Sequence, residues 1–565
     1  MGTKQRISDG LFRAKLLTGS IILGAFLGVT TYIFWLSGWA GMDLIQLARG
    51  GLYVYQRAPG MLGLAAFGGA FGLGWIAWMF AWRPGAARPG DADDDADNLR
   101  GQQLVTVAEI KKQIRSAKTK TRLEIGGVPI PIYVEDGGFL LTGSPGTGKS
   151  QATTKMLDTL QAGGHRAVIA DAEGIFYSRY AGDGAVLFNP LDRRSVSWSP
   201  LAELKSPQDC SALAKSLIPD GHGAEASWND AAQTVLEGLL RRCWETSKTN
   251  AELYRLACVA DIEELQQLLA GTAAMTVVGN ARYFGEVRPG LGRYLRCFEH
   301  LDPAAGRASF SVRDFITEET GWLFISYTQE QRAALLPLIQ CTLDVASRAI
   351  LSLPHTTGDR SKLRRTWLVL DELPLLGRIM SLIPLLTNGS KHGAAVIATA
   401  QTIALFREAY GHDATQTILA TLGTWLTLRV SDAETAEYMS KSLGDEEVRR
   451  VVASGGKNDS GKSDNWSEQH STRRVVMPSQ LQNLPRLHGY LNISGPLPVC
   501  AVTLPYADER EPAAPAYEPA PLRSAVPVPV SAAVTSEADP STVEGDGNTT
   551  DTTADSADVP FTLER

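Results

Sequence analysis

The sequence predicts an α/β fold in which helices cover a parallel sheet, with an all-helical region inserted into it and two transmembrane helices before it. Three observations lead to this prediction. Two long uncharged apolar runs stand near the N-terminus, short apolar runs alternate with helical stretches from Gly126 onward, and the strand-like runs stop between Ser195 and about Phe310. Strands that alternate with helices are typical of parallel sheets buried on both faces.

The first element is a predicted transmembrane hairpin, residues 16–82, which follows a short N-terminal segment of residues 1–15. Its spans are the uncharged runs 16–36 and 61–82, each long enough to cross a hydrocarbon core of ~30 Å. Four basic residues precede the first span and two follow the second: Lys4, Arg6, Arg13, Lys15, Arg83 and Arg88. Only Arg49 and Arg57 lie between the spans. By the positive-inside rule both termini are cytoplasmic and a short loop lies outside. The length of the first run and the second span after it disfavour a cleaved signal peptide.

Residues 83–122 form a predicted linker and basic stem. The stretch 83–98 is rich in Pro, Gly and Asp and has no means of packing a core. The stretch 111–122, KKQIRSAKTKTR, holds six basic residues and no acidic one. Such a cluster suits contact with anionic lipid or with a nucleic-acid backbone, and a solvated helix face explains it equally well.

The globular part is predicted to have two regions. The strand-like runs FLLTG, HRAVIAD, GWLFISY, RTWLVLDE, AAVIATAQ and TWLTLRV place the α/β domain in residues 123–194 and 311–505. Residues 195–310 contain helical patterns such as SWNDAAQTVLEGLLRRCWETS and DIEELQQLLAG, which indicate an all-α insertion. The Gly- and Ser-rich stretch 453–472 is predicted to be a mobile loop.

The formal net charge of −7 is unevenly distributed along the chain. Residues 506–565 carry a net charge of −9 and few aromatic residues, which predicts a disordered acidic tail. Such a tail suits the capture of a basic partner by charge attraction, or it serves only to keep the protein soluble. The six cysteines have no CxxC spacing, which argues against a zinc site or a disulfide framework.

Residues 143–150, GSPGTGKS, match the GxxxxGK[ST] phosphate-binding motif and stand between a predicted strand and a predicted helix. The glycines let backbone N–H groups point at phosphate oxygens, and the helix N-terminus adds partial positive charge. Lys149 is expected to reach the β- and γ-phosphates of ATP, and the Ser150 hydroxyl to ligate Mg²⁺. The predicted nucleotide-binding residues are Gly143, Ser144, Pro145, Gly146, Thr147, Gly148, Lys149, Ser150 and Gln151.

A second motif supplies carboxylates. The run RRTWLVLDELP (364–374) places Asp371 and Glu372 at the tip of a predicted strand. Asp371 is expected to hold Mg²⁺ through water, and Glu372 to polarise the attacking water as general base. The next strand, AAVIATAQT (394–402), ends near Gln401, whose amide suits a contact with the γ-phosphate or the attacking water.

Five segments in order resemble the type IV coupling proteins of bacterial conjugation, the TraD/TrwB group. They are DAEGIFYSRY with AVLFNPLDRRSVSWSP (171–200), FSVRDFI (310–316), GWLFISY (321–327), AILSLP (349–354) and LVLDELPLLGRIMSLIPLLTNGSKHG (368–393). The resemblance covers nearly all of residues 15–505. It implies a RecA-like P-loop motor and a homo-hexameric ATPase ring on the bacterial inner membrane.

The resemblance also implies partners and a role for the insertion. In this family the ring recruits the relaxase-bound DNA strand of the relaxosome and feeds it to a type IV secretion channel, and the helical insertion contacts DNA. The resemblance therefore implies a DNA-dependent ATPase that translocates DNA, with single-stranded DNA favoured over duplex DNA. By position, Lys149 and Ser150 are the P-loop pair, Asp371 and Glu372 the Walker B pair, and Gln401 the sensor.

The sequence departs from the family at one position. Relatives often carry an arginine finger for the neighbouring subunit after Walker B, where this chain has Ser390. Lys391 is a substitute, although an ammonium group lacks the two-pronged geometry of a guanidinium. Other candidates for the finger are Arg378, Arg407 and Arg429.

Basic pairs are the candidates for phosphate contacts with DNA, which would carry little sequence preference. They are Arg193, Arg194, Arg241 and Arg242, with Lys391 a further candidate. Trp228, at the start of a predicted helix, is expected to be a core anchor rather than a platform for a base.

Three other functions compete with this interpretation. A duplex DNA translocase of the FtsK type shares the motor and the membrane anchoring, but nothing after Pro505 resembles its winged-helix reader. A docking receptor that uses nucleotide only as a switch would not need Glu372. A coupling receptor for protein cargo stays open, because the insertion and the tail select the cargo.

Overall fold

The computed structural model describes residues 97–521, apart from 183, 222–224, 302–309, 319, 357, 359–364 and 459–460, and four single residues, 25, 68, 71 and 72. Apart from those four residues, the two predicted transmembrane spans lie outside the described part, as does the tail beyond residue 521. Within that part, one helix, α14 (Gln329–Leu351), is long and apolar enough to cross a membrane, and most of it is buried in the core.

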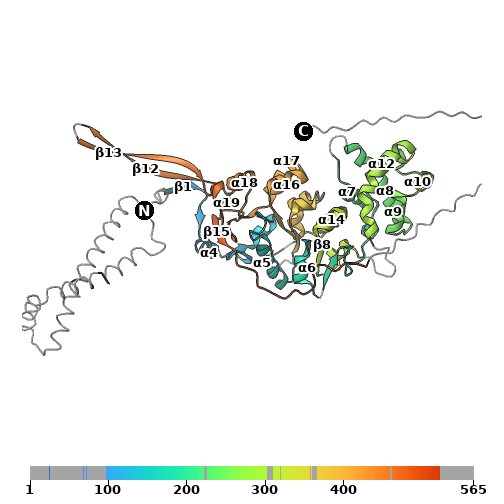
Figure 1. Ribbon diagram of the computed structural model, residues 1–565, viewed down its shortest axis with the longest axis horizontal. Helices are drawn as coiled ribbons and strands as arrows, with labels where there is room; N and C mark the ends of the chain where they lie inside the picture. The colour runs from blue at the N-terminus through green and yellow to red at the C-terminus, as the bar shows by residue number, and fades with distance from the viewer. Residues whose placement is uncertain are drawn as a thin grey trace, which may run out of the picture. The chain divides into compact units, whose positions relative to one another are not determined.

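A ten-stranded sheet is the framework of the described chain (Figure 1). In spatial order its strands are β2 (Leu104–Val105), β15 (Val499–Thr503), β14 (His488–Asn492), β11 (Thr424–Leu428), β5 (Phe139–Thr142), β10 (Ala394–Ala400), β9 (Thr366–Leu370), β6 (Arg166–Ala172), β8 (Trp322–Tyr327) and β7 (Ala185–Phe188). Strands β11 through β7 all run parallel. The six strands predicted from apolar runs are all present, which confirms the α/β fold.

The sheet is mixed rather than wholly parallel, which corrects the prediction at one edge. Strand β14 runs antiparallel to β11, and β15 runs antiparallel to β14. Only residues 493–498 join β14 to β15. This connection is too short for a crossover helix, and short connections between neighbouring strands give antiparallel pairs.

Alternate residues of the strands build a separate core on each face of the sheet. On one face Leu141 and Val369 pack in a cluster with α4 (Val107–Ser116), α5 (Lys149–Ala162) and α6 (Ile175–Tyr180). On the other face Leu140 and Leu368 belong to a cluster that includes α14, α16 (Ile403–Tyr410), α17 (His412–Thr421) and α18 (Ala433–Leu443). Burial on both faces explains why these strands read as continuous apolar runs.

Shorter elements complete the part around the sheet. They are β3 (Thr121–Ile125), β4 (Val128–Pro131), η1 (Ile132–Gly137), η5 (Leu373–Leu376), α15 (Leu382–Asn388), η6 (Gly389–His392) and α19 (Pro478–Gln482). Strands β3 and β4 form a two-stranded sheet of their own.

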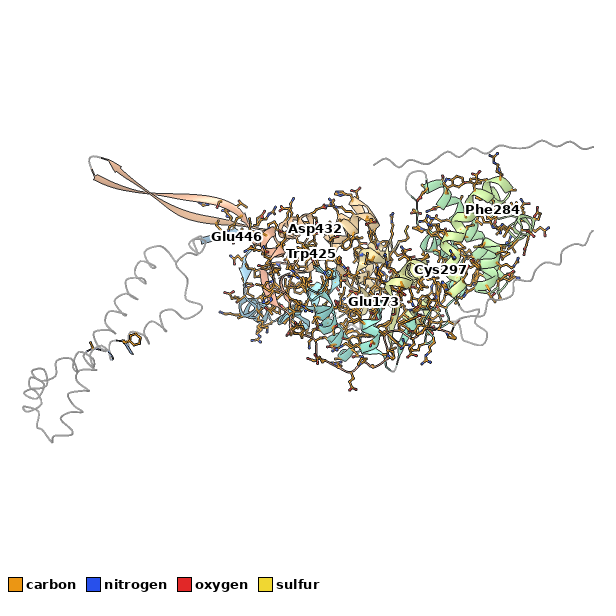
Figure 2. All side chains as sticks on the ribbon, viewed as in Figure 1. Glu173, Phe284, Cys297, Trp425, Asp432 and Glu446 are labelled. Carbon is orange, nitrogen blue, oxygen red and sulfur yellow. The ribbon has the colours of Figure 1, made fainter. Side chains whose placement is uncertain are left out.

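The described chain between β7 and β8 forms helices and no named strand, in the region where an all-α insertion is predicted. Its elements are η2 (Pro200–Glu203), α7 (Pro207–Leu217), α8 (Glu225–Glu245), α9 (Asn250–Cys258), α10 (Ile262–Leu268), α11 (Met275–Val278), α12 (Ala281–Leu295), η3 (Arg296–His300) and α13 (Val312–Glu318). Figure 1 shows α8, α9, α10 and α12 gathered together in green, and Figure 2 places Phe284 and Cys297 among them. Both residues are buried in a core shared with α14.

Glu203 joins the two chain segments that lead into and out of this helical region. Its carboxylate has no exposed surface. It accepts hydrogen bonds from Trp198 Nε1 at 2.8 Å, Val312 N at 2.7 Å and Arg313 N at 3.1 Å. Nearby, Phe310 N donates to Ser197 O at 2.7 Å. The entry and exit segments are therefore fastened to each other.

The prediction of a mobile loop over 453–472 is wrong for the residues that the structure describes there. Strand β12 (Asp445–Asn458) pairs antiparallel with β13 (Gly461–Arg474), and β1 (Asp97–Gly101) pairs with β12. The Gly- and Ser-rich sequence gave no apolar alternation, which is the signal that a strand prediction needs.

Residues 506–521, assigned above to the disordered tail, lie on the surface of the sheet domain in a defined course. We call this segment the C-terminal strap. Ala513 N donates to Ser178 O at 2.7 Å, and Ala520 N donates to Leu191 O at 2.8 Å. No strap residue is buried. Composition alone could not reveal this course, because the contacts are mostly polar and come from distant parts of the chain.

Candidate nucleotide-binding site

The phosphate-binding motif forms the turn between β5 and α5, as predicted. Gly143 N donates to Ala400 O at 3.2 Å, and Ser144 N donates to Arg429 O at 2.8 Å, so neighbouring strands fix the start of the loop. Gly148 has φ of 122°, and a Cβ there would lie 2.7 Å from Leu487. Only glycine suits that position, because other residues disfavour this conformation and the space is filled.

Lys149 begins α5 and is largely buried, with 7% of its side chain exposed. Its Nζ donates to Gly143 O at 2.7 Å and lies 3.1 Å from Glu372 Oε1. The structure thus brings together the lysine and the glutamate that the two motifs predict, although 223 positions separate them in the sequence.

Asp371 follows the last residue of β9, and burial raises the pKa of its carboxyl to about 6. Its Oδ1 accepts a hydrogen bond from Thr399 Oγ1 at 2.9 Å. Thr399 Oγ1 in turn accepts one from Glu372 N at 2.8 Å. The hydroxyl on β10 therefore fixes both acidic residues at the end of β9.

Glu372 adopts a left-handed backbone conformation with φ of 52°, which is uncommon for a residue other than glycine. Its Oε2 is buried and makes no hydrogen bond within the described chain. A strained backbone and an unsatisfied buried oxygen are both costly, and such features concentrate at functional sites.

Sequence reasoning missed two residues of this site. Thr399 stands two positions before Gln401, but its role depends on the alignment of β10 with β9. Asp171 ends the buried part of β6 and accepts hydrogen bonds from Phe176 N at 3.1 Å and Tyr177 N at 2.6 Å. Burial, with a smaller contribution from Asp371, raises the pKa of Asp171 to about 7. The acidic residue at a strand end in IADAEG was the available signal.

The remaining predicted site residues lie around this centre. Ser150 is exposed in the first turn of α5, and Gln401 follows β10 between β5 and β9. The Gln151 side chain accepts a hydrogen bond from Ala507 N at 2.7 Å, which ties the strap to α5. Among the described residues no group of three or more His, Cys, Asp or Glu could hold a metal ion. The oxygens of Ser150 and Asp371 still suit Mg²⁺, which takes one or two protein ligands and completes its shell with phosphates and water.

The candidate finger residues lie in different surroundings. Arg407 forms an ion pair with Glu434, and Lys391 is exposed in η6. Arg378 is partly buried beyond η5. The carbonyl oxygen of Arg429 accepts a hydrogen bond from Ser144 N, at the start of the phosphate loop.

The four arginines among the candidate DNA contacts are engaged in ion pairs within the chain. Arg194 pairs with Asp192 at 2.6 Å and with Glu518 of the strap at 3.4 Å, and Arg193 also pairs with Glu518. Arg241 and Arg242 pair with Glu245 at 3.0 and 3.1 Å.

The expectation that Trp228 is a core anchor is wrong. Its side chain is 39% exposed, and its ring lies 5.8 Å from that of Tyr283. Its position at the start of α8 leaves it at the edge of the helical core.

Comparison with known proteins extends these findings. The family model described as the type IV secretion-system coupling protein DNA-binding domain matches residues 122–505. The coupling protein TraD of Escherichia coli K12 is 24% identical over 447 residues, which make up 76% of this chain and 60% of TraD. The chain thus spans three fifths of the length of that relative.

Solved structures of the plasmid coupling protein TrwB are similar in fold. TrwB in complex with ADP and Mg²⁺ is 29% identical, with a TM-score of 0.68, and the match covers 77% of this chain and 100% of TrwB. TrwB with the GTP analogue GDPNP is 29% identical, with a TM-score of 0.67, covering 76% and 99% of the two chains. This likeness confirms a RecA-like P-loop NTPase with a mixed sheet.

Proposed function

Because this chain belongs to the type IV secretion-system coupling proteins, we propose that it is an ATPase that couples the relaxosome to a type IV secretion system and pumps the conjugative DNA strand. The observation that carries the proposal is the pairing of Lys149 with Glu372 at the carboxyl end of the parallel strands. A lysine and an acidic residue held in this way are the parts that phosphoryl transfer to water requires.

The phosphate loop and α5 bind the phosphates of ATP. Their backbone N–H groups and the helix N-terminus favour anions, and Lys149 faces the β- and γ-phosphates. Ser150 and Asp371 are the proposed ligands of Mg²⁺, which neutralises charge on the phosphates when bound. TrwB has been solved in complex with ADP and Mg²⁺, which supports a magnesium-bound nucleotide as the ligand of this site.

Arrival of the γ-phosphate changes the partner of Lys149. In the structure its ammonium group holds Glu372 Oε1 at 3.1 Å. A phosphate with higher charge competes for that ammonium group and releases Glu372. The carboxylate, with an Oε2 that has no hydrogen-bond partner in the described chain, then accepts the proton of the attacking water. The Thr399 hydroxyl keeps Glu372 in place by accepting a hydrogen bond from Glu372 N. Gln401 contacts the γ-phosphate or that water.

The proposed arrangement of the whole chain follows its family. Residues 16–82 anchor it in the bacterial inner membrane with both termini in the cytoplasm. The predicted linker and basic stem, residues 83–122, follow, although β2 and α4 in the second half of that range belong to the sheet domain. The motor comprises residues 123–194 and 311–505, residues 195–310 are the inserted domain, and residues beyond 521 are the acidic tail. Six copies form a ring, in which Lys391, Arg378, Arg407 or Arg429 reaches the neighbouring site. Single-stranded DNA, relaxase and the secretion channel are its partners.

A second function, the delivery of protein cargo, is favoured by the charge of the insertion. Residues 195–310 contain 11 basic and 14 acidic residues, and Arg241 and Arg242 are already paired with Glu245. A surface of this kind offers few free cations to a phosphate backbone, whereas it attracts a basic protein.

The nucleotide part of the proposal is tested by Mg²⁺-dependent ATP hydrolysis of the full-length chain in lipid nanodiscs. We expect Lys149→Ala to abolish ATP binding and hydrolysis, because the variant loses the buried cation that faces the phosphates. Lys441→Ala, at the exposed end of α18, is the matched control and keeps wild-type activity. Full hydrolysis by Lys149→Ala would contradict the assignment.

A further inference from the structure

Tyr506 is a large exposed aromatic residue beside the nucleotide site. Its side chain is 61% exposed. The described part of the chain offers its hydroxyl no hydrogen bond and its ring no aromatic neighbour. Exposure of an aromatic ring is not unusual by itself, but the backbone around this one is fixed on both sides.

Two anchors hold the backbone of Tyr506 against the phosphate loop and α5. On one side, Leu504 N donates to Leu487 O at 2.7 Å, and Leu487 N donates to Thr147 O at 3.0 Å. On the other side, Ala507 N donates to Gln151 Oε1 at 2.7 Å. The segment that carries the exposed ring is thereby attached to the loop at Thr147 and to the first turn of α5 at Gln151.

The position of these anchors indicates which end of a nucleotide Tyr506 would meet. Lys149 and Glu372 mark the γ-phosphate end of the site. Gln151 lies beyond Ser150 on the helix, where the cradle continues to the α-phosphate, and the ribose and base follow the α-phosphate. Tyr506 is thus attached at the end of the site from which a base extends.

The comparisons add a chemical requirement for the base site. Structures of TrwB hold ADP in one case and the GTP analogue GDPNP in another. Adenine and guanine present different donors and acceptors at their edges, but both present an aromatic face. A base held through its face is bound without regard to its edge, as in sequence-tolerant stacking on aromatic side chains.

We propose that the ring of Tyr506 is the stacking surface for the purine base of the nucleotide. The inference rests on the proposed nucleotide site and adds a base subsite to it. It implies that ATP and GTP bind with similar affinity. It also gives the start of the C-terminal strap a role in binding, because Ala507 fixes the residue that contacts the base.

The test is a comparison of ligands with and without a base, using the full-length chain in nanodiscs. The variants are Tyr506→Ala, Tyr506→Phe and, as matched control, Tyr133→Ala, whose exposed tyrosine lies in η1 before β5. The ligands are ADP, GDP and inorganic tripolyphosphate, with binding measured by calorimetry in the presence of Mg²⁺.

We expect Tyr506→Ala to weaken ADP and GDP binding about 5- to 100-fold and to leave tripolyphosphate binding unchanged. Tyr506→Phe and Tyr133→Ala should bind all three ligands as the wild type does. Unchanged ADP affinity in Tyr506→Ala, or an equal loss for tripolyphosphate, would overturn the base subsite while leaving the phosphate site intact. A wild-type chain that binds neither ADP nor tripolyphosphate would overturn both proposals.

Discussion

Asp171 and Asp371 are two buried carboxyl groups at the ends of neighbouring strands, and each has a raised pKa for the same main reason. Burial disfavours the charged form, which raises the pKa of Asp371 to about 6 and that of Asp171 to about 7. Between about pH 4 and pH 7 these two groups therefore bind more protons in the folded chain than in the unfolded chain. Their contribution to the free energy of unfolding falls as the pH rises through this window.

Substitution of Asp171 by asparagine tests this dependence. The asparagine side chain would stay neutral at every pH, while its carbonyl oxygen still accepts a hydrogen bond from Tyr177 N. Between pH 5 and pH 8, we expect the melting temperature of the wild type to fall by ~5 °C more than that of Asp171→Asn. Differential scanning calorimetry measures this, with Asp413→Asn in the exposed first turn of α17 as control. Parallel pH curves for the wild type and Asp171→Asn would contradict it.

At the scale of single residues, local motifs identified the chemistry but not its supports. The pattern GSPGTGKS and the pair Asp371–Glu372 each carry a local signal, and the structure joins them through Lys149. Thr399 and Asp171 could not be assigned in the same way, because their roles depend on which residues face them from adjacent strands. Tyr506 was missed because it begins a segment whose composition suggests disorder.

At the scale of elements, the attachment of the helical region depends on one buried carboxylate. Removing the acceptor in Glu203→Ala leaves the indole N–H of Trp198 and the backbone N–H groups of Val312 and Arg313 without a partner. We expect a loss of ~3 kcal/mol in the free energy of unfolding.

Chemical denaturation measures this loss, and limited proteolysis locates it in residues 195–318. Glu203→Gln keeps one acceptor oxygen and should lose less. Glu330→Ala, in the exposed first turn of α14, is the control. A stability of Glu203→Ala equal to that of the control would show that the helical region is held by other contacts.

The C-terminal strap is held mainly by polar contacts, so we expect it to detach at high salt. Its ion pairs join Asp508 to Lys155 at 3.1 Å, Arg510 to Asp158 at 3.5 Å, and Glu518 to Arg193 and Arg194. Surface pairs of this kind contribute ~0–1 kcal/mol each and are screened by salt.

Hydrogen exchange at Glu518 N and Ala520 N measures the detachment. At low salt, we expect amide exchange in the strap of Glu518→Ala to be as fast as exchange in the wild type at high salt. Glu509→Ala, an exposed strap residue, is the matched control and should not change the rates. Exchange that is slow at every salt concentration in Glu518→Ala would mean that the backbone contacts suffice.

How much of each element could be predicted depended on its burial. The parallel strands were evident because both of their faces are covered and nearly every residue is apolar. Strands β12 and β13 have a polar sequence, and in β14 and β15 buried residues alternate with more exposed ones. Neither pair therefore resembles the continuous apolar runs of the parallel strands. The strap was unpredictable because its partners, from Gln151 to Arg194, come from elements far away in sequence.

At the scale of the whole molecule, the helical region that divides the sheet domain was predictable from the sequence pattern. It lies between β7 and β8, where the strand signals are lost. The predicted transmembrane spans lie outside the described residues. The ring, the DNA and the secretion channel stay proposals that follow from the family and from the nucleotide site.

The central proposal is that the chain is a DNA-stimulated ATPase in which Glu372 is the general base. The most direct test is to measure ATP hydrolysis by the full-length chain in nanodiscs with and without single-stranded DNA. We expect DNA to raise the rate several-fold in the wild type. Glu372→Gln should still bind ATP but lose the basal and the DNA-stimulated rates by ~10²- to 10⁴-fold, because its amide cannot accept the proton of the attacking water. ATP hydrolysis that does not respond to DNA, or that persists in Glu372→Gln, would contradict a DNA-driven motor.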